Sequence, residues 1–197
     1  MKKKKNNKRK KNKLSLNILC ILILLAVCIY FIALNIMFPR RYKEIVEQAA
    51  SIYNIDPNLI YAVIKQESNF NKNAVSYSNA KGLMQIMDPT SKQMARKIDT
   101  IDDKNYDVFD PYTNIHMGAK YLSYLIKYFD GNYYLAIIAY NAGMGRVDTW
   151  LEAEYNEYTD YSKLLDNIQY DETKTYFEKV LNYYNIYTKL YDKPVKY

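Results

Sequence analysis

The sequence predicts a mainly α-helical domain that follows one N-terminal transmembrane helix. A 25-residue apolar run, 14–38, comes directly after a strongly basic N-terminus. Beyond it, three Asp-Pro pairs have the form of helix starts, and apolar residues then recur every three or four positions. No segment predicts a strand with confidence.

The N-terminus combines charge and hydropathy in the order of a membrane anchor. Residues 1–13 contain nine Lys or Arg and no acid. The run 14–38, as a helix, would reach roughly 37 Å, enough to cross a hydrocarbon core of about 30 Å. The positive-inside rule then places the basic tail in the cytoplasm and everything after Phe38 outside. A cleaved signal peptide is the alternative. However, the run is longer than the usual apolar segment of a signal peptide, and no A-x-A-like cleavage site clearly follows it.

The net charge of +7 comes from this basic tail. Without its nine cations the chain has 19 Lys or Arg against 21 acids, a balance of −2. We therefore interpret the tail as a topology signal that touches anionic lipid, and we predict no nucleic-acid partner. Cys20 and Cys28 both lie in the apolar run, so the rest of the chain has no thiol for a disulfide, a zinc site or catalysis.

Residues 39–197 have the size of one compact domain, without repeats or long linkers. An acid that caps a helix, followed by proline at its first position, is predicted three times. Apolar spacing predicts a helix after the third pair, broken at 130–132, a second over 133–141 capped by Gly143, and a third over 172–191. The three pairs are Asp56-Pro57, Asp88-Pro89 and Asp110-Pro111. Most of the 23 tyrosines are interpreted as residues that fill the edges of the core.

One acidic residue falls on an apolar helix stripe. On the helix that Asp56-Pro57 begins, Glu67 continues the face of Ile60, Val63 and Ile64. An apolar wall of this kind raises the pKa of a carboxyl group, whereas a glutamate at a helix end is more often simply exposed. Three other segments carry polar residues that ordinary capping or burial would explain when each is taken alone: 82–87, 139–143 and 172–176.

Together and in this order, these segments resemble the Slt-type lytic transglycosylase family of lysozyme-like proteins. The resemblance covers residues 40–191 and implies a lysozyme-like helical domain over 39–197. It departs from the family at Asn79, where glycine is frequent, at Asp88, which separates Met87 from the proline, and at Gln169, which replaces a common proline. The matching strings are Glu67-Ser68-Asn69-Phe70 with Ala74 and Ser76; Gly82-Leu83-Met84-Gln85-Ile86-Met87; Ala139-Tyr140-Asn141-Ala142-Gly143 with Gly145, Val147 and Trp150; and Glu172-Thr173 with Tyr176.

The resemblance implies the chemistry of the site. Glu67 would protonate the oxygen between N-acetylmuramic acid and N-acetylglucosamine, and would then act as base toward the muramoyl 6-hydroxyl, which closes a 1,6-anhydro ring. Asn141 and Tyr176 would lie near Glu67. The expected partners are peptidoglycan glycan strands and, through the N-terminal helix, membrane lipid. The groove would be lined by Ser76, Gln85, Met87, Tyr140 and Glu172.

Two other functions stay open from the sequence. A hydrolytic muramidase would ordinarily need a second carboxylate, and the candidates Asp88 and Glu172 are also explained as acids at helix starts. A non-catalytic wall-binding component of a secretion or conjugation machine would keep the groove without needing Glu67.

No cofactor or metal is expected. The single histidine, His116, is predicted to lie on a solvated helix face, because Lys120, Ser123 and Lys127 share that face. No glycine-rich phosphate loop is visible in the sequence either.

Overall fold

The computed structural model describes residues 2–152, 168 and 170–191, with side chains from residue 17 onward except at residue 152. The chain divides into two compact units, 1–39 and 40–197, which we describe separately. The prediction of a mainly α-helical fold is confirmed, because the described residues form helices and no strand. Two isolated β-bridges, Val75 to Lys81 and Lys81 to Ile86, lie within one loop of the second unit.

The first unit is a single helix, α1, Lys2–Met37. Its segment Asn17–Met37 has a mean hydropathy of 2.9, with none of its apolar window buried, and is long enough to cross a membrane. The helix starts well before the apolar run, because the lysines and arginines of the tail are good helix formers. Length and composition therefore suit the predicted anchor, and the direction of insertion stays a prediction.

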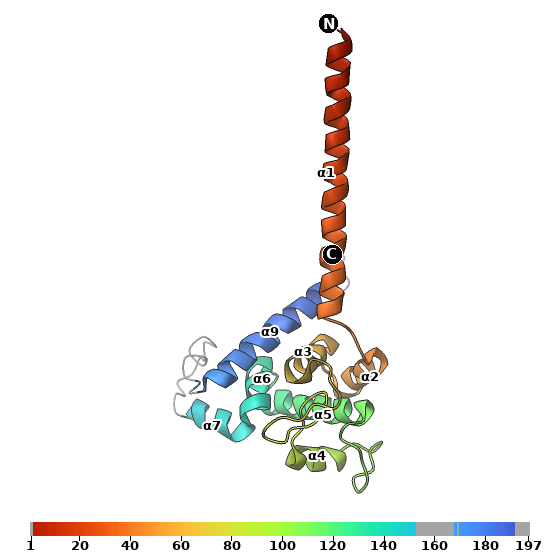
Figure 1. The fold of residues 1–197 in the computed structure, drawn as a ribbon. Helices are drawn as coiled ribbons and strands as arrows, with labels where there is room; N and C mark the ends of the chain where they lie inside the picture. Colours follow the sequence, from red (N-terminus) through yellow and green to blue (C-terminus); the bar gives the residue numbers. More distant parts are fainter. Residues whose placement is uncertain (1, 153–167, 169, 192–197) are drawn as a thin grey trace. The chain divides into compact units, whose positions relative to one another are not determined.

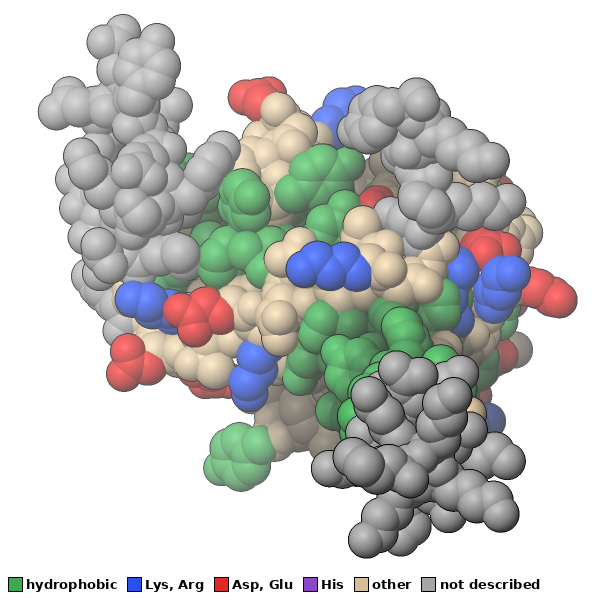
Figure 2. Space-filling model, turned by 90° about the horizontal axis from the view of Figure 1, so that it is seen from above, with side chains coloured by type: hydrophobic (Ala, Val, Ile, Leu, Met, Phe, Trp, Pro, Cys, Tyr) green, Lys and Arg blue, Asp and Glu red, His purple; other side chains and the backbone are tan. Residues whose placement is uncertain are grey.

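The second unit is a cluster of helices around α5, which lies between α4 and α6 in Figure 1. α3 packs along α9, α2 packs on α5, and α6 also contacts α7 and α9. Acidic and basic side chains are interspersed on the face drawn in Figure 2, as the nearly neutral composition predicts. The helices are α2 (Lys43–Tyr53), α3 (Pro57–Ser68), α4 (Asp88–Ala95), α5 (Pro111–Tyr128), α6 (Tyr133–Ala142), α7 (Met144–Glu152) and α9 (Asp171–Tyr191).

Two of the three predicted Asp-Pro helix starts are formed as expected. The Asp56 carboxylate accepts the backbone N–H of Asn58 at 2.8 Å at the start of α3. Asp110 accepts the backbone N–H of Thr113 at 2.9 Å at the start of α5. The other predicted boundaries also hold, since α6 begins at Tyr133 and α9 begins one residue before its predicted start.

For the remaining pair, Asp88-Pro89, the helix was predicted to begin one residue too late. Met87 is the N-cap of α4, and Asp88 is already its first helical residue, with Pro89 second. The Asp88 carboxylate binds the Lys81 ammonium group at 2.7 Å instead of capping the helix. An acid in the first helical turn is favoured by the helix dipole as well, so the position is stable without a cap.

The prediction for His116 was wrong. Its side chain is buried at 1% exposure, and Nδ1 lies 3.1 Å from the Tyr53 hydroxyl. Burial lowers the pKa of His116, which favours the neutral ring. The error arose because α2, which the sequence reading did not identify, covers this face of α5. Lys120, on the same face, places its ammonium group 5.3 Å from the centre of the Tyr53 ring.

The start of the second unit is fixed by an arginine between two aromatic rings. The Arg40 guanidinium lies 5.2 Å from the Tyr61 ring centre and 5.1 Å from that of Tyr191, and it binds Glu47 at 3.0 Å. Tyr187 stacks on Tyr61 at 5.3 Å. Tyr61 and Tyr187 are fully buried, so for these two tyrosines the interpretation as packing residues is confirmed. The cluster joins the first residue of the unit to α3 and α9.

Candidate active site

Glu67 lies in the last turn of α3, one residue before the helix ends at Ser68. Asn69 and Phe70 follow in the left-handed conformation, with φ of 49° and 64°, so the chain turns away sharply there. Ile60 and Ile64 on the same face are fully buried, whereas Glu67 itself is half-buried. The carboxyl group thus lies at the edge of the core, beside the negative end of the helix dipole, which disfavours its charge.

Burial raises the pKa of Glu67 to about 7. The Tyr176 hydroxyl donates a hydrogen bond to Oε1 at 2.8 Å, which lowers the pKa, but the effect of burial is larger. At neutral pH about half of the molecules would carry a protonated Glu67, compared with about one in 500 for an ordinary glutamate. The group is therefore suited to donate a proton and to take one back.

Two tyrosines surround this carboxyl group. Tyr176 of α9 and Tyr140 of α6 both have pKa values well above the usual range, first because they are buried and then because of the Glu67 charge. Both hydroxyls consequently remain protonated donors. The Tyr140 hydroxyl donates to the Met84 carbonyl at 2.9 Å, so it anchors the loop before α4 to α6.

The loop over 71–87 uses two predicted groove residues to hold its own shape. Ser76 Oγ accepts the backbone N–H of Ala80 at 3.0 Å. The Gln85 side-chain amide donates to the carbonyls of Gly82 at 2.8 Å and Ala74 at 3.2 Å, and Gln85 itself has φ of 50°. Ser68, next to Glu67, donates to the Leu83 carbonyl at 2.7 Å. The loop is thereby fixed directly to the helix that carries Glu67.

Sequence reasoning missed the residue of α5 that holds this loop through hydrogen bonds. Asn114 of α5 is fully buried, and its Oδ1 accepts the Met84 backbone N–H at 2.7 Å. Its Nδ2 donates to the carbonyls of Lys81 at 3.0 Å and Val108 at 2.8 Å. The signal that could have identified it is an amide four residues before Gly118, on a helix face that is otherwise apolar.

A glycine makes this contact possible. Gly82 has φ of 77°, and a Cβ atom there would overlap the Asn114 amide. The glycine in the second matching segment is therefore required both by its backbone conformation and by the space that Asn114 occupies.

The remaining predicted residues lie at the ends of α6, α4 and α9. Asn141 is exposed, and its Oδ1 accepts a hydrogen bond from the buried Thr173 at 2.9 Å, which joins α6 to α9. Glu172 is exposed beside Thr173, and Met87 is 41% exposed at the start of α4. Of the predicted residues, Tyr176 thus donates a hydrogen bond to Glu67, and Tyr140 bonds to the loop that contains Ser76, Gln85 and Met87. The structure shows no hydrogen bond or ion pair of Asn141 or Glu172 with Glu67 among the described residues.

Two departures from the family pattern contact one another. Asn79 has φ of 64°, a conformation that asparagine tolerates better than most residues. Its amide donates to the Asp88 carboxylate at 3.4 Å, and the same carboxylate binds Lys81. The asparagine and the extra aspartate therefore belong to one local arrangement. Gln169, the third departure, lies outside the described residues.

Comparison with known proteins places this geometry in a family. Residues 44–162 match the family described as transglycosylase SLT domain. The chain belongs to this family. The resemblance that the sequence indicated is confirmed, and the transglycosylase SLT domain covers Glu67, Tyr140 and the loop between them.

The relatives include soluble and membrane-bound proteins. The soluble lytic murein transglycosylase of Escherichia coli K12 is 33% identical over 147 residues, which are 74% of this chain and 23% of that protein. The membrane-bound lytic murein transglycosylase C of Histophilus somni strain 2336 is 37% identical over 118 residues, 55% of this chain and 32% of that protein. This chain therefore aligns with only 23% and 32% of the length of these two relatives.

Solved structures of the family share the fold of the SLT domain. The 70 kDa soluble lytic transglycosylase of E. coli superposes with a TM-score of 0.74 at 32% identity, over 81% of this chain and 26% of that one. The structure of an inactive mutant of the Pseudomonas aeruginosa enzyme Slt, in which a glutamate is replaced by glutamine, superposes with a TM-score of 0.72 at 35% identity. The match covers 79% of this chain and 25% of that one.

Proposed function

We propose that this chain is a peptidoglycan lytic transglycosylase with Glu67 as its acid and base. The observation that supports it best is the half-buried carboxyl group of Glu67, with a pKa near 7 and a hydrogen bond from Tyr176, in a domain of the transglycosylase SLT family. Among the glutamates whose side chains are described, Glu67 alone is not exposed. A glutamate-to-glutamine change accompanies loss of activity in the Pseudomonas relative.

The reaction needs a single proton that is given and then returned. Protonated Glu67 transfers its proton to the oxygen between N-acetylmuramic acid and N-acetylglucosamine, and the bond from this oxygen to the muramoyl C1 breaks. The resulting carboxylate then takes the proton of the muramoyl 6-hydroxyl while O6 bonds to C1. The products are a free 4-hydroxyl on N-acetylglucosamine and a 1,6-anhydromuramoyl end, and no water is consumed.

The placement of the other acids favours this route over hydrolysis. The hydrolytic alternative would use a second carboxylate to activate water. Asp88 is bound to Lys81, and Glu172 is exposed at the start of α9. An internal hydroxyl nucleophile removes the need for such a group, because the attacking atom is already attached to the substrate.

The other predicted site residues are proposed to hold the sugar rather than to transfer protons. Their geometry suggests two roles: Ser76, Gln85 and Met87 belong to the loop beside Glu67, whereas Tyr140 fixes that loop through its bond to Met84. Asn141 and Glu172 lie near the start of α9, where they would contact a bound strand at the rim.

The chain is further proposed to act at the membrane. The helix Asn17–Met37 would span the bilayer once, with residues 1–13 in the cytoplasm and the domain from residue 39 onward outside, where its substrate lies. The membrane-bound relatives agree with a membrane location. Protease added to intact cells should remove the domain from outside and leave the tail protected.

The products of the reaction test the proposed function. The full chain in detergent micelles is incubated with purified peptidoglycan, and the new glycan termini are identified by mass spectrometry. Anhydromuramoyl ends are expected. Reducing muramic acid ends would instead identify a hydrolase, and intact glycan strands would point to a wall-binding component.

Tyr176→Phe is expected to move the alkaline limb of the pH–activity profile to higher pH. The Tyr176 hydroxyl stabilises the charged form of Glu67, so its removal raises the pKa of Glu67 further and extends the pH range of the acid form. The maximum rate should fall about tenfold, because the carboxyl group loses a hydrogen bond that orients it. The profile of kcat/KM against pH measures both effects.

Tyr140→Phe is the matched control for this variant. It removes a buried hydroxyl that bonds to Met84 and not to Glu67. The alkaline limb of the Tyr140→Phe profile should stay at the wild-type pH even if the rate falls. An alkaline limb that does not move in Tyr176→Phe, or that moves to lower pH, would contradict the positioning role of Tyr176.

A further inference from the structure

A hollow lies at the opposite end of the helices that carry the candidate active site. α3 and α9 run antiparallel, with the Glu67–Tyr176 bond at one end and a 2.7 Å bond from the Tyr184 hydroxyl to Asp56 at the other. Eleven residues of helix separate Asp56 from Glu67, a rise of about 16 Å. A hollow of about 520 Å³ opens at the Asp56 end, so it is distinct from the surroundings of Glu67.

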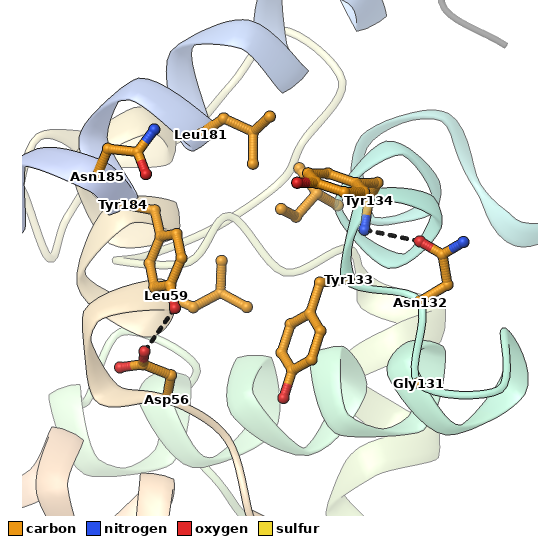
Figure 3. A pocket seen from close by; sticks show the side chains of 10 residues that line it. Asp56, Leu59, Gly131, Asn132, Tyr133, Tyr134, Leu181, Tyr184 and Asn185 are labelled. Atoms are coloured by element: carbon orange, nitrogen blue, oxygen red, sulfur yellow. Dashed lines mark hydrogen bonds between the residues drawn. The ribbon is translucent and has the colours of Figure 1, made fainter. Parts of the chain in front are cut away.

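Aromatic rings at the mouth and apolar side chains beneath form this hollow. Tyr133 and Tyr134, from the start of α6, are 43% and 40% exposed, so a ligand in the hollow can reach them. Figure 3 shows the rings of Tyr184 and Tyr133 on either side of Leu59. Leu59 and Ile137 are each 1% exposed and make the floor.

The lining is held in place by bonds within the domain. Asn132 caps α6 by accepting the backbone N–H groups of Tyr134 at 3.0 Å and Leu135 at 3.2 Å. Asp56 is held both by Tyr184 and by the start of α3. A ligand would therefore meet a preformed surface and would lose little affinity to the ordering of side chains.

The chemistry of the described lining disfavours an anionic ligand and suits an uncharged sugar. Among the described residues that line the hollow, Asp56 is the one charged residue, and none is a lysine, arginine or histidine. Asn132 and Asn185 present neutral amides beside the tyrosine rings. A pyranose ring has an apolar face for an aromatic ring, together with hydroxyl and acetamide groups for amides and a carboxylate. The volume lies within the usual range of small-ligand sites, about 300–1,000 Å³.

We propose that this hollow is a second saccharide-binding site, which takes an uncharged N-acetylhexosamine segment of a glycan strand away from the point of cleavage. Tyr133 supplies the stacking ring. The Asn185 amide donates or accepts hydrogen bonds at the sugar edge, and the Asp56 carboxylate accepts them from sugar hydroxyl groups. The choice of ligand rests on the proposed function. The site itself rests on the aromatic and neutral polar lining. It would hold a long strand on the enzyme without taking part in the chemistry.

Binding of a peptide-free sugar tests the site directly. The probe is the tetramer of N-acetylglucosamine, titrated by calorimetry into the full chain in detergent micelles, with Glu67→Gln present to prevent turnover. Two sites per chain are expected, and Tyr133→Ala should leave one. Asn185→Ala, at an exposed position of α9, should weaken the same site about tenfold.

Kinetics on long and short glycans give a second readout. Tyr133→Ala in the otherwise unchanged chain should raise KM for polymeric glycan strands about tenfold, with kcat unchanged and with no effect on a tetrasaccharide. Tyr128→Ala is the matched control, because Tyr128 is 44% exposed and does not line the hollow. It should alter neither KM.

Several outcomes would overturn the site. One sugar bound per chain, both with and without Tyr133→Ala, would do so, as would binding of stem peptides without binding of the sugar. In the kinetics, an unchanged KM for polymeric glycan in Tyr133→Ala would do so. A tenfold rise of that KM in Tyr128→Ala would also do so. These results are distinct from failure of the proposed function, which would appear as the absence of anhydro ends from the wild-type chain.

Discussion

Glu67→Gln is expected to slow the formation of anhydro ends by about 10²-fold to 10⁴-fold, the contribution of a positioned general acid. The amide keeps the size of the side chain and still accepts the Tyr176 hydrogen bond, but it has no proton to give. Binding of glycan should persist, because the loop and the helices around the residue are untouched. Release of anhydromuramoyl products per unit time measures the loss.

The same substitution is expected to stabilise the fold at alkaline pH. The pKa of Glu67 is about 7 in the folded chain, whereas an ordinary glutamate, as in the unfolded chain, has a pKa of 4.5. The folded state therefore binds more protons than the unfolded state between these two pH values. Stability therefore falls as pH rises from about 4.5 to 7 and stays reduced above that range. Glutamine removes this cost, which we place at about 1–3 kcal/mol after allowance for solvent screening of a half-buried group.

Unfolding by urea at pH 8 and at pH 4 measures this gain, which should be present at pH 8 and absent at pH 4. Glu172→Gln is the matched control, because Glu172 is an exposed acid at a helix start and should change stability by less than about 0.5 kcal/mol. Wild-type turnover by Glu67→Gln would falsify the catalytic assignment. A loss of stability at pH 8 would show that the charged form of Glu67 is not disfavoured by burial.

The features that could be predicted from the sequence are those that depend on neighbours in the chain. The caps of α3 and α5, the glycine end of α6 and the extent of α9 each follow from residues within a few positions. The place of Glu67 on a buried stripe followed in the same way. The start of α4 was misplaced by one residue because Asp88 pairs with Lys81, seven residues earlier, and a local pattern does not record such a bond.

The features that were missed depend on segments far apart in the chain. His116 is buried by α2, whose apolar face was not recognised, and its partner Tyr53 lies 63 residues away. Asn114 reaches a loop 30 residues earlier, and Tyr140 reaches the same loop across 56 residues. The hollow at the Asp56 end needs residues from α3, α6 and α9 together. None of these contacts follows from helical period, because they depend on how the helices pack.

Asn114→Ala is expected to destabilise the domain by about 3–5 kcal/mol. The substitution leaves three backbone groups without their partner, namely the buried N–H of Met84 and the partly buried carbonyls of Lys81 and Val108. Each such group costs about 1–3 kcal/mol when it is left unpaired away from water, and relaxation of the loop recovers part of the sum. Urea unfolding of the full chain in micelles, followed by near-ultraviolet circular dichroism, measures the loss. Asn105→Ala, at an exposed loop position, should stay within about 0.5 kcal/mol.

Asn114→Asp separates the amide's donor role from its acceptor role. One carboxylate oxygen still accepts the Met84 N–H. The other oxygen takes the place of the donating NH₂ group, so it faces the Lys81 and Val108 carbonyls with no hydrogen-bond donor. The variant should therefore be at least as unstable as Asn114→Ala at pH 7 and should recover at acidic pH, where the protonated acid donates to one carbonyl. Wild-type stability at pH 7 would contradict the assigned orientation of the amide. Because the loop that Asn114 holds also bonds to Ser68 beside Glu67, both variants should raise KM for glycan at temperatures where they remain folded.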